Sequence, residues 1–175
     1  WTPRGINIWS EHGDLELEKM SCAITENEKN LTISSTTNSE KVNMQRMDLV
    51  ALLPANINIS INNKEGNVFI RNFKKNLYIK TSHGSIVAKT KEAIKDNIIL
   101  LNDHGNAILR SAPGSRGKLD FEAVNGNVKA NLRAGSVIIT SKSNNKNLKG
   151  LLNEGDNTIL LRSANGVSRF DVVQK

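Results

Sequence analysis

The feature that most constrains the fold is a tight turn that recurs along the whole chain. Its glycine copies are Gly13, Gly66, Gly84, Gly105, Gly126 and Gly166, and two further copies centre on Asn38 and Asn144. Glycine and asparagine tolerate the left-handed backbone that such turns require. Successive turns lie 18 to 28 residues apart. The chain is therefore built from an internal repeat of about 20 residues.

Apolar residues flank each turn at fixed offsets. Large apolar residues stand seven and five positions before every turn residue, as Leu77 and Ile79 do before Gly84. Four positions after each turn the residue is again apolar, as at Ala88. Alternation with a period of two is typical of strands that bury one face. The pattern predicts an all-β protein; only Lys89–Asn97 could form one helical turn, and it could equally return the chain between strands.

The regular spacing of the turns favours a β-solenoid over a β-sandwich. Each coil of strand, turn and strand would stack on the previous coil at a strand spacing of about 4.8 Å. The eight turns predict about eight coils in one domain that spans residues 1–175. Within this domain, residues 1–48 should form less regular, acidic coils, and residues 49–175 should form regular, basic coils.

One segment resembles a known family. Met47–Ile61 contains an apolar strand, a proline and a second apolar strand, and the sequence Gly66-Asn67-Val68 follows it. This pattern resembles the putative adhesin family of β-solenoid domains, which is related to the toast-rack proteins of bacterial envelope-stress systems and has eukaryotic members that look mitochondrial. The resemblance extends from about Gly5 to Val173. It implies a non-enzymatic binding or scaffold module with no cofactor and no catalytic residue.

Charge is distributed unevenly along the chain. Residues 1–48 hold five basic and eight acidic residues, whereas residues 49–175 hold 19 basic and nine acidic residues. Stacked coils could align one group of these cations into a stripe that attracts anionic lipid or glycan. This group comprises Lys74, Lys75, Lys89, Lys91, Lys95, Arg116 and Lys118, and Arg110 lies among the same segments. Alternatively, such lysines only prevent unwanted strand addition. Aromatic residues are too scarce to predict specific nucleic-acid binding.

An apolar row occupies positions that should face outward. Six residues before the turn, the late repeats carry Ile99, Ile138 and Leu160, and Leu101 follows two positions after Ile99. Asp120 interrupts this row. Such a row predicts a surface for a protein partner or for another part of the chain. The alternative is a flattened coil that buries both faces.

Two groups of residues carry side chains of the types used in catalysis or metal binding. Asp120 and Glu122 should point outward together, as the carboxylates of a β-helix enzyme acting on acidic glycans would. Their expected neighbours are Ile99 and Leu101 on one coil and Ile138 and Thr140 on another, so no acidic cluster is predicted. His83 and His104 should lie on adjacent coils, close enough to touch, and His12 occupies the equivalent position. These positions are more typical of polar turns than of a metal site, and none is predicted.

The end of the chain suggests how it meets partners. Arg169–Lys175 has no helix or proline to cap the last coil, so we expect it to pair with a second copy or with a partner domain. The preferred function is a binding or scaffold module, as a subunit of a larger assembly or an envelope protein. The alternatives are a carbohydrate-active enzyme and a basic accessory subunit of a mitochondrial complex. A bacterial cell envelope and a mitochondrial matrix both fit the composition, and no apolar run is long enough for a membrane helix.

Overall fold

The protein is all-β. The computed structural model describes residues 5–10, 20–26, 31–37, 47–132 and 135–173. These residues form 16 strands and no helix, so the expected fold class is confirmed at that level. Residues 90–97 form no helical turn and connect two strands. In this part of the chain no helix is available to cross a membrane.

The chain forms two compact units, Trp1–Pro54 and Ala55–Lys175. The expectation of one domain over residues 1–175 stays a prediction. In the first unit, β1 (Gly5–Ser10) pairs with β4 (Met47–Leu52), and β2 (Met20–Glu26) pairs with β3 (Leu31–Thr37). Both ladders are antiparallel. The parallel stacking predicted for the coils around Gly13 and Asn38 is therefore wrong for these four strands. Gly13 and Asn38 themselves lie outside the described residues.

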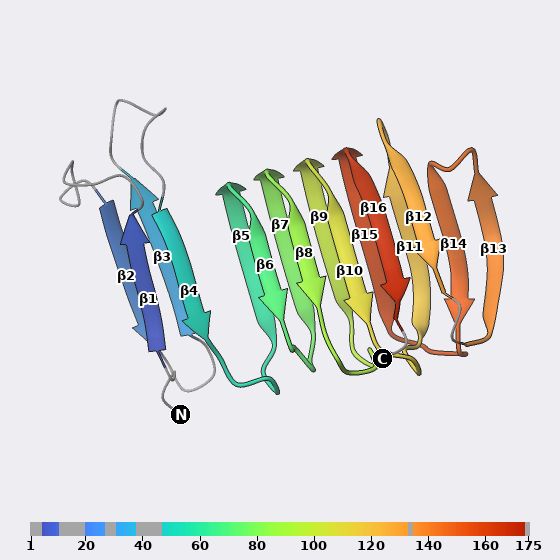
Figure 1. The fold of residues 1–175 in the computed structure, drawn as a ribbon, viewed down its shortest axis with the longest axis horizontal. Coiled ribbons are helices and arrows are strands. Elements are labelled where there is room, and N and C mark those ends of the chain that lie inside the picture. Colours follow the sequence, from blue (N-terminus) through green and yellow to red (C-terminus); the bar gives the residue numbers. More distant parts are fainter. Residues whose placement is uncertain (1–4, 11–19, 27–30, 38–46, 133–134, 174–175) are drawn as a thin grey trace. The chain divides into compact units, whose positions relative to one another are not determined.

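The second unit consists of two sheets (Figure 1). The seven-stranded sheet contains β5 (Ile59–Glu65), β7 (Leu77–His83), β9 (Ile98–His104), β15 (Thr158–Asn165), β11 (Gly117–Ala123), β14 (Asn147–Leu152) and β13 (Val137–Ser143), in that spatial order. The five-stranded sheet contains β6 (Val68–Arg71), β8 (Ile86–Lys89), β10 (Ala107–Ser111), β16 (Val167–Val172) and β12 (Asn127–Asn131).

The repeats stack in an order that differs from the sequence. Five strand–turn–strand repeats lie parallel to one another, and the last of them, β15–β16, lies between β9–β10 and β11–β12. The repeat around Asn144 is an antiparallel hairpin, β13–β14, that extends the larger sheet beyond β11. A simple stack of eight consecutive coils is therefore wrong, because β14 occupies the place beside β11 and the chain returns to insert its last repeat.

The C-terminal strand is not an unpaired end. β16 pairs with β10 on one side and with β12 on the other, and β15 pairs with β9 and β11. The backbone groups of β15 and β16 are thus already paired on both sides, so neither strand has a free edge to which another strand could add. The prediction that this end is open to a second copy is therefore wrong for residues 169–173, and residues 174–175 lie outside the described residues.

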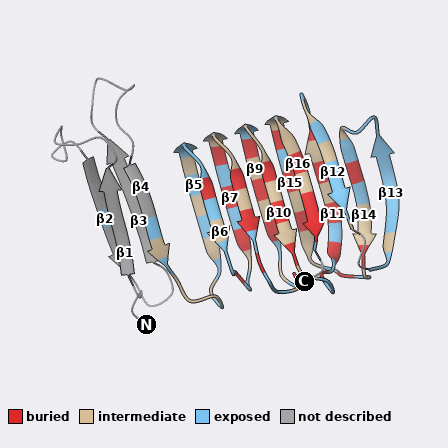
Figure 2. Ribbon diagram, viewed as in Figure 1, coloured by how far each residue is buried: buried red, intermediate tan, exposed pale blue. Residues whose placement is uncertain are grey.

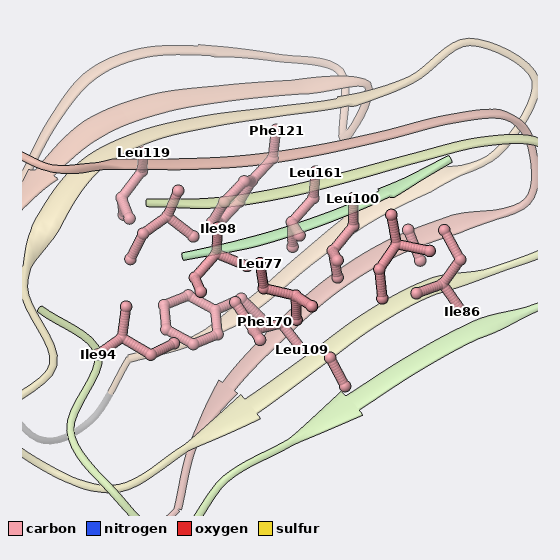
Figure 3. Close-up of a cluster of buried hydrophobic side chains, with 14 of the residues drawn as sticks. Leu77, Ile86, Ile94, Ile98, Leu100, Leu109, Leu119, Phe121, Leu161 and Phe170 are labelled. Atoms are coloured by element: carbon pink, nitrogen blue, oxygen red, sulfur yellow. The ribbon is translucent and has the colours of Figure 1, made fainter. Parts of the chain in front are cut away.

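The core lies between the two sheets of the second unit (Figure 2). Side chains at the predicted inward positions of the middle repeats are fully buried, as Leu77, Ile79, Leu100 and Leu161 are. Figure 3 shows Leu77, Leu100 and Leu161 in one cluster with Phe121 and Phe170. The two phenylalanine rings meet edge to face, with their centroids 6.0 Å apart. Ile139 is an exception and is 52% exposed, because β13 lies two strands beyond β11.

The turn glycines stack closely from repeat to repeat. A Cβ atom added at Gly84 would overlap the carbonyl oxygen of Gly66, and one at Gly105 would overlap that of Gly84. Gly166 approaches Gly105 in the same way, and Gly126 approaches Gly166. The contacts therefore follow the same order as the strands. Only glycine allows the backbones of neighbouring turns to come this near.

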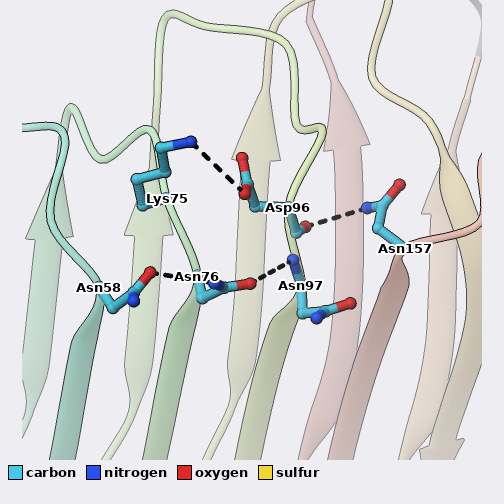
Figure 4. Close-up of polar contacts among 6 residues, drawn as sticks. All are labelled: Asn58, Lys75, Asn76, Asp96, Asn97 and Asn157. Carbon is cyan, nitrogen blue, oxygen red and sulfur yellow. Dashed lines mark hydrogen bonds and ion pairs between the residues drawn. The ribbon is translucent and has the colours of Figure 1, made fainter.

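Asparagine side chains join the repeats at the opposite ends of these strands (Figure 4). The Nδ2 group of Asn76 donates to Oδ1 of Asn58 at 2.9 Å, and the backbone N–H of Asn97 donates to Oδ1 of Asn76 at 3.0 Å. The N–H of Thr158 donates to Oδ1 of Asn97 at 2.8 Å. This amide ladder thus continues into the inserted C-terminal repeat and satisfies the backbone N–H groups at the starts of β9 and β15.

The alternation on β7 can be tested with two adjacent substitutions. Ile79 is fully buried and Lys80 is exposed. We expect Ile79→Asp to unfold the second unit, because burying an unpaired carboxylate costs several kcal/mol against a total stability of roughly 5–15 kcal/mol. Lys80→Asp should leave the thermal unfolding transition nearly unchanged. Equal tolerance of both changes, measured by circular dichroism, would contradict this register.

The stacking of the turns can be tested with Gly105→Ala. Gly105 has a φ of +128° and no room for a Cβ, whereas Gly66 has a φ of +94° and open space around it. Gly66→Ala should therefore cost only the backbone strain of about 1–3 kcal/mol. Gly105→Ala should cost clearly more in urea unfolding, since the carbonyl of Gly84 must also move. Equal costs would mean that the close approach does not constrain the turn.

Candidate binding surfaces

An apolar patch lies on the outer face of the seven-stranded sheet. Tyr78, Ile99 and Leu160 face the same way in direct register on β7, β9 and β15. Leu101 lies two residues after Ile99 on the same face of β9. Tyr78 is 37% exposed, and the other three side chains are half-buried. We call these four residues the apolar patch.

The structure brings together three of the four residues predicted for a partner surface. Ile99, Leu101 and Leu160 share the patch, because β15 lies directly beside β9. Ile138 lies apart on β13, where it is 55% exposed and pairs with Leu151. Tyr78 was missed, although it occupies the same outward position of its own repeat. Asp120 does not interrupt the patch, since β11 lies beyond β15.

Asp120 and Glu122 point outward together, and both have cationic neighbours. Arg162 Nε lies 3.3 Å from Glu122 Oε2, and Arg162 Nη2 lies 4.0 Å from Asp120 Oδ2. Lys149 Nζ is 3.8 Å from the same Asp120 oxygen. The predicted neighbours on adjacent coils are therefore wrong, because β15 and β14 flank β11. These contacts are surface ion pairs.

His83 and His104 stack as predicted. Their ring centroids lie 4.7 Å apart with an interplanar angle of 7°. Glu65 is in register on one side of the pair and Asn165 on the other. Among the described residues, no three His, Cys, Asp or Glu side chains are grouped so that they could hold a metal ion. His12 lies outside the described residues.

The predicted basic stripe is divided among three parts of the second unit. Lys89 lies on the five-stranded sheet and Lys118 on the seven-stranded sheet. The other members lie in the segments that connect strands: Lys74, Lys75, Lys91, Lys95 and Arg116. Lys74 Nζ lies 3.1 Å from a Glu92 oxygen, and Lys75 Nζ lies 3.8 Å from one of Asp96. The connecting segments themselves are joined by hydrogen bonds, as between Thr90 and Phe73 and between Arg116 and Ile94, and one continuous stripe stays a prediction.

A different set of cations follows the outer face of the five-stranded sheet. Each strand contributes one outward cation, and we call the set the cation path: Arg71, Lys89, Arg110, Arg169 and Lys129. The sequence pointed to Lys89 and Arg110 but not to the other three. In the sequence, these cations stand at outward positions, five residues after the turn glycine in three repeats and three residues after it in the other two.

One buried carboxylate lies within the cation path. Asp171 is only 4% exposed. The Nε group of Arg169 donates to both of its oxygens, at 2.9 and 2.8 Å, and Nε of Arg110 lies 3.4 Å from Oδ2. A single acid thus lies between two guanidinium groups, which is an arrangement that satisfies a buried charge.

Comparison with known proteins bears on the fold. No family model matches the chain, and no curated protein matches it by sequence. A solved structure that resembles it is that of a putative cell adhesion protein from Clostridium sporogenes ATCC 15579. The two chains are 17% identical, with a TM-score of 0.57, over 97% of this chain and 82% of that one. At this identity the likeness shows a shared fold alone.

The role of Asp171 can be tested by Asp171→Asn. We expect the free energy of unfolding to fall by about 1–3 kcal/mol, because a charge-assisted contact is lost and two guanidinium groups remain beside each other. Asp103→Asn, at an exposed position on β9, is the control and should have little effect. Urea unfolding measures both. An unchanged midpoint for Asp171→Asn would contradict a stabilising role.

Proposed function

We propose that this chain is a non-enzymatic binding or scaffold module, a member of the putative adhesin family of β-solenoid domains, that acts through protein–protein contact. The apolar patch carries the proposal. It places three large side chains in register at the centre of a sheet face. Adjacent apolar side chains on an outer face favour an interaction surface, particularly where a polar rim surrounds them.

The rim of the patch supports a second copy of the chain as the partner. Lys80, Leu101, Arg162 and Glu122 form one row across β7, β9, β15 and β11. A two-fold axis parallel to the strands, between β9 and β15, would place Lys80 of one copy opposite Glu122 of the other. The same axis would place Ile99 opposite Leu160 and the Tyr78 hydroxyl opposite Asp120. The charged pair and the Ile99–Leu160 pair are thus complementary, as an isologous interface requires, while Leu101 would lie opposite Arg162.

The surroundings of Asp120 and Glu122 favour this role over glycan hydrolysis. Retaining and inverting glycosidases use a pair of carboxylic groups with different protonation states beside the scissile bond. Here both carboxylates lie against Arg162, and Asp120 also lies near Lys149. The structural neighbour is likewise named for adhesion rather than for an enzymatic activity.

The proposed dimer can be tested by light scattering over a concentration series. Wild-type protein should reach the mass of two chains, and Ile99→Arg combined with Leu160→Arg should shift the series to the monomer, since two buried charges would oppose each other. Asn127→Arg combined with Asn131→Arg, at exposed positions on the outer face of the five-stranded sheet, adds the same charge and is the control that should leave the dimer intact. A wild-type monomer at every concentration would overturn the second copy as partner.

A charge exchange tests the orientation of the two copies. Lys80→Glu alone and Glu122→Lys alone should each weaken the dimer, because each places like charges opposite one another across the two-fold axis. The double variant should restore dimerisation. Failure of the double variant to recover, while both single variants remain folded, would contradict the proposed axis.

A further inference from the structure

We infer that the outer face of the five-stranded sheet is a second binding surface, and that its ligand is a linear acidic polysaccharide that lies across the strands. The observation is the cation path, in which every strand of the sheet contributes one Lys or Arg side chain. This surface faces away from the core on the sheet opposite the apolar patch. The inference therefore does not depend on the proposed dimer.

The register of the sheet makes the path continuous. Arg71 is paired with Lys89, and Lys89 is paired with Arg110. The path then shifts by two residues to Arg169, which is paired with Lys129. Asp171 connects the two segments, because it is the strand partner of Arg110 and contacts Arg169. Four steps at a strand spacing of about 4.8 Å mean that the path spans roughly 19 Å across the sheet.

The path is electrostatically costly in the free protein. Like charges directly opposite each other on neighbouring strands destabilise a sheet, and Arg71, Lys89 and Arg110 occupy such positions. Asp171 is the single acid among the outward side chains of this sheet, and it is shared between two guanidinium groups. The Nε atom of Arg110 forms no hydrogen bond, so Asp171 does not saturate that side chain. A polyanion along the path would offset this repulsion.

An apolar row beside the path indicates which polyanion fits. Phe69, Val87 and Ile108 are in register on β6, β8 and β10, two residues before the first three cations. Phe69 is 64% exposed, while Val87 and Ile108 are half-buried. The apolar faces of sugar rings can pack on this row while their carboxylate or sulfate groups reach the cations.

Other polyanions fit these residues less well. Single-stranded nucleic acid is bound on several aromatic side chains that stack with successive bases, and Phe69 is the one aromatic residue on this described face. A membrane surface would need several projecting apolar side chains, but Val87 and Ile108 are half-buried. A sheet face with one cation on every strand and an apolar row beside them therefore favours an extended sugar polymer.

Isothermal titration of the purified chain with polygalacturonate, and with neutral dextran as the uncharged reference, tests the inference. Polygalacturonate should bind with an affinity that falls as salt rises, and dextran should not bind. Arg71→Gln combined with Lys89→Gln should weaken binding between about two-fold and thirty-fold, because two exposed charge contacts are lost. Lys64→Gln combined with Lys118→Gln removes the same charge from the other sheet and should leave the affinity unchanged.

A third variant separates the apolar row from the charges. Phe69→Ala should weaken polygalacturonate binding even at high salt, where the ionic contacts are screened. Equal losses in the two double variants would overturn the inference in favour of an effect of net charge. Tighter binding of a uridine homopolymer than of polygalacturonate would overturn it in favour of nucleic acid. Binding to phosphatidylserine vesicles without binding to polygalacturonate would overturn it in favour of a membrane.

Discussion

The close approach of neighbouring turns is the constraint on which the second unit depends. At Gly84, Gly105 and Gly166, the carbonyl oxygen of the preceding turn occupies the space that a Cβ would need. This contact fixes the height of one repeat over the next, so the strands on both sides of each turn enter register together. The amide ladder through Asn76 and Asn97 fixes the opposite ends in the same register. Side chains at equivalent positions must therefore align into rows.

The insertion of the last repeat determines which side chains each row contains. Because β15 lies beside β9, Leu160 extends the apolar row of Tyr78 and Ile99. In a stack of consecutive repeats β15 would lie three strands from β9. Because β16 lies beside β10, Asp171 reaches Arg110 and joins the two segments of the cation path. Both candidate surfaces thus depend on the insertion of β15 and β16 between earlier strands. The same insertion keeps the C-terminal strand away from the edge of the sheet.

The sequence predicted what depends on local alternation and missed what depends on the order of strands. The inward positions of the middle repeats, such as Ile79 and Leu100, and the contact between His83 and His104 follow from offsets within a repeat. The neighbours of Asp120 cannot be predicted from such offsets. A repeat that is inserted between earlier strands has the same turn and the same alternation as one that stacks in sequence order. The hairpin around Asn144 also has the pattern of a coil, and the pairing of its two strands with each other distinguishes it. No local signal encodes either choice.

The two proposed surfaces have a joint consequence. They lie on opposite sheets, so a dimer formed through the seven-stranded sheets would turn its two cation paths outward in opposite directions. One polysaccharide chain could not follow both paths without bending around the particle, whereas two separate chains could each occupy one. Such a dimer would therefore cross-link anionic polymers, and its attachment to a surface rich in them would gain from the high effective concentration of the second site. Under this arrangement, weak individual sites are sufficient for firm attachment, and the modest charge of each path is in keeping with that requirement.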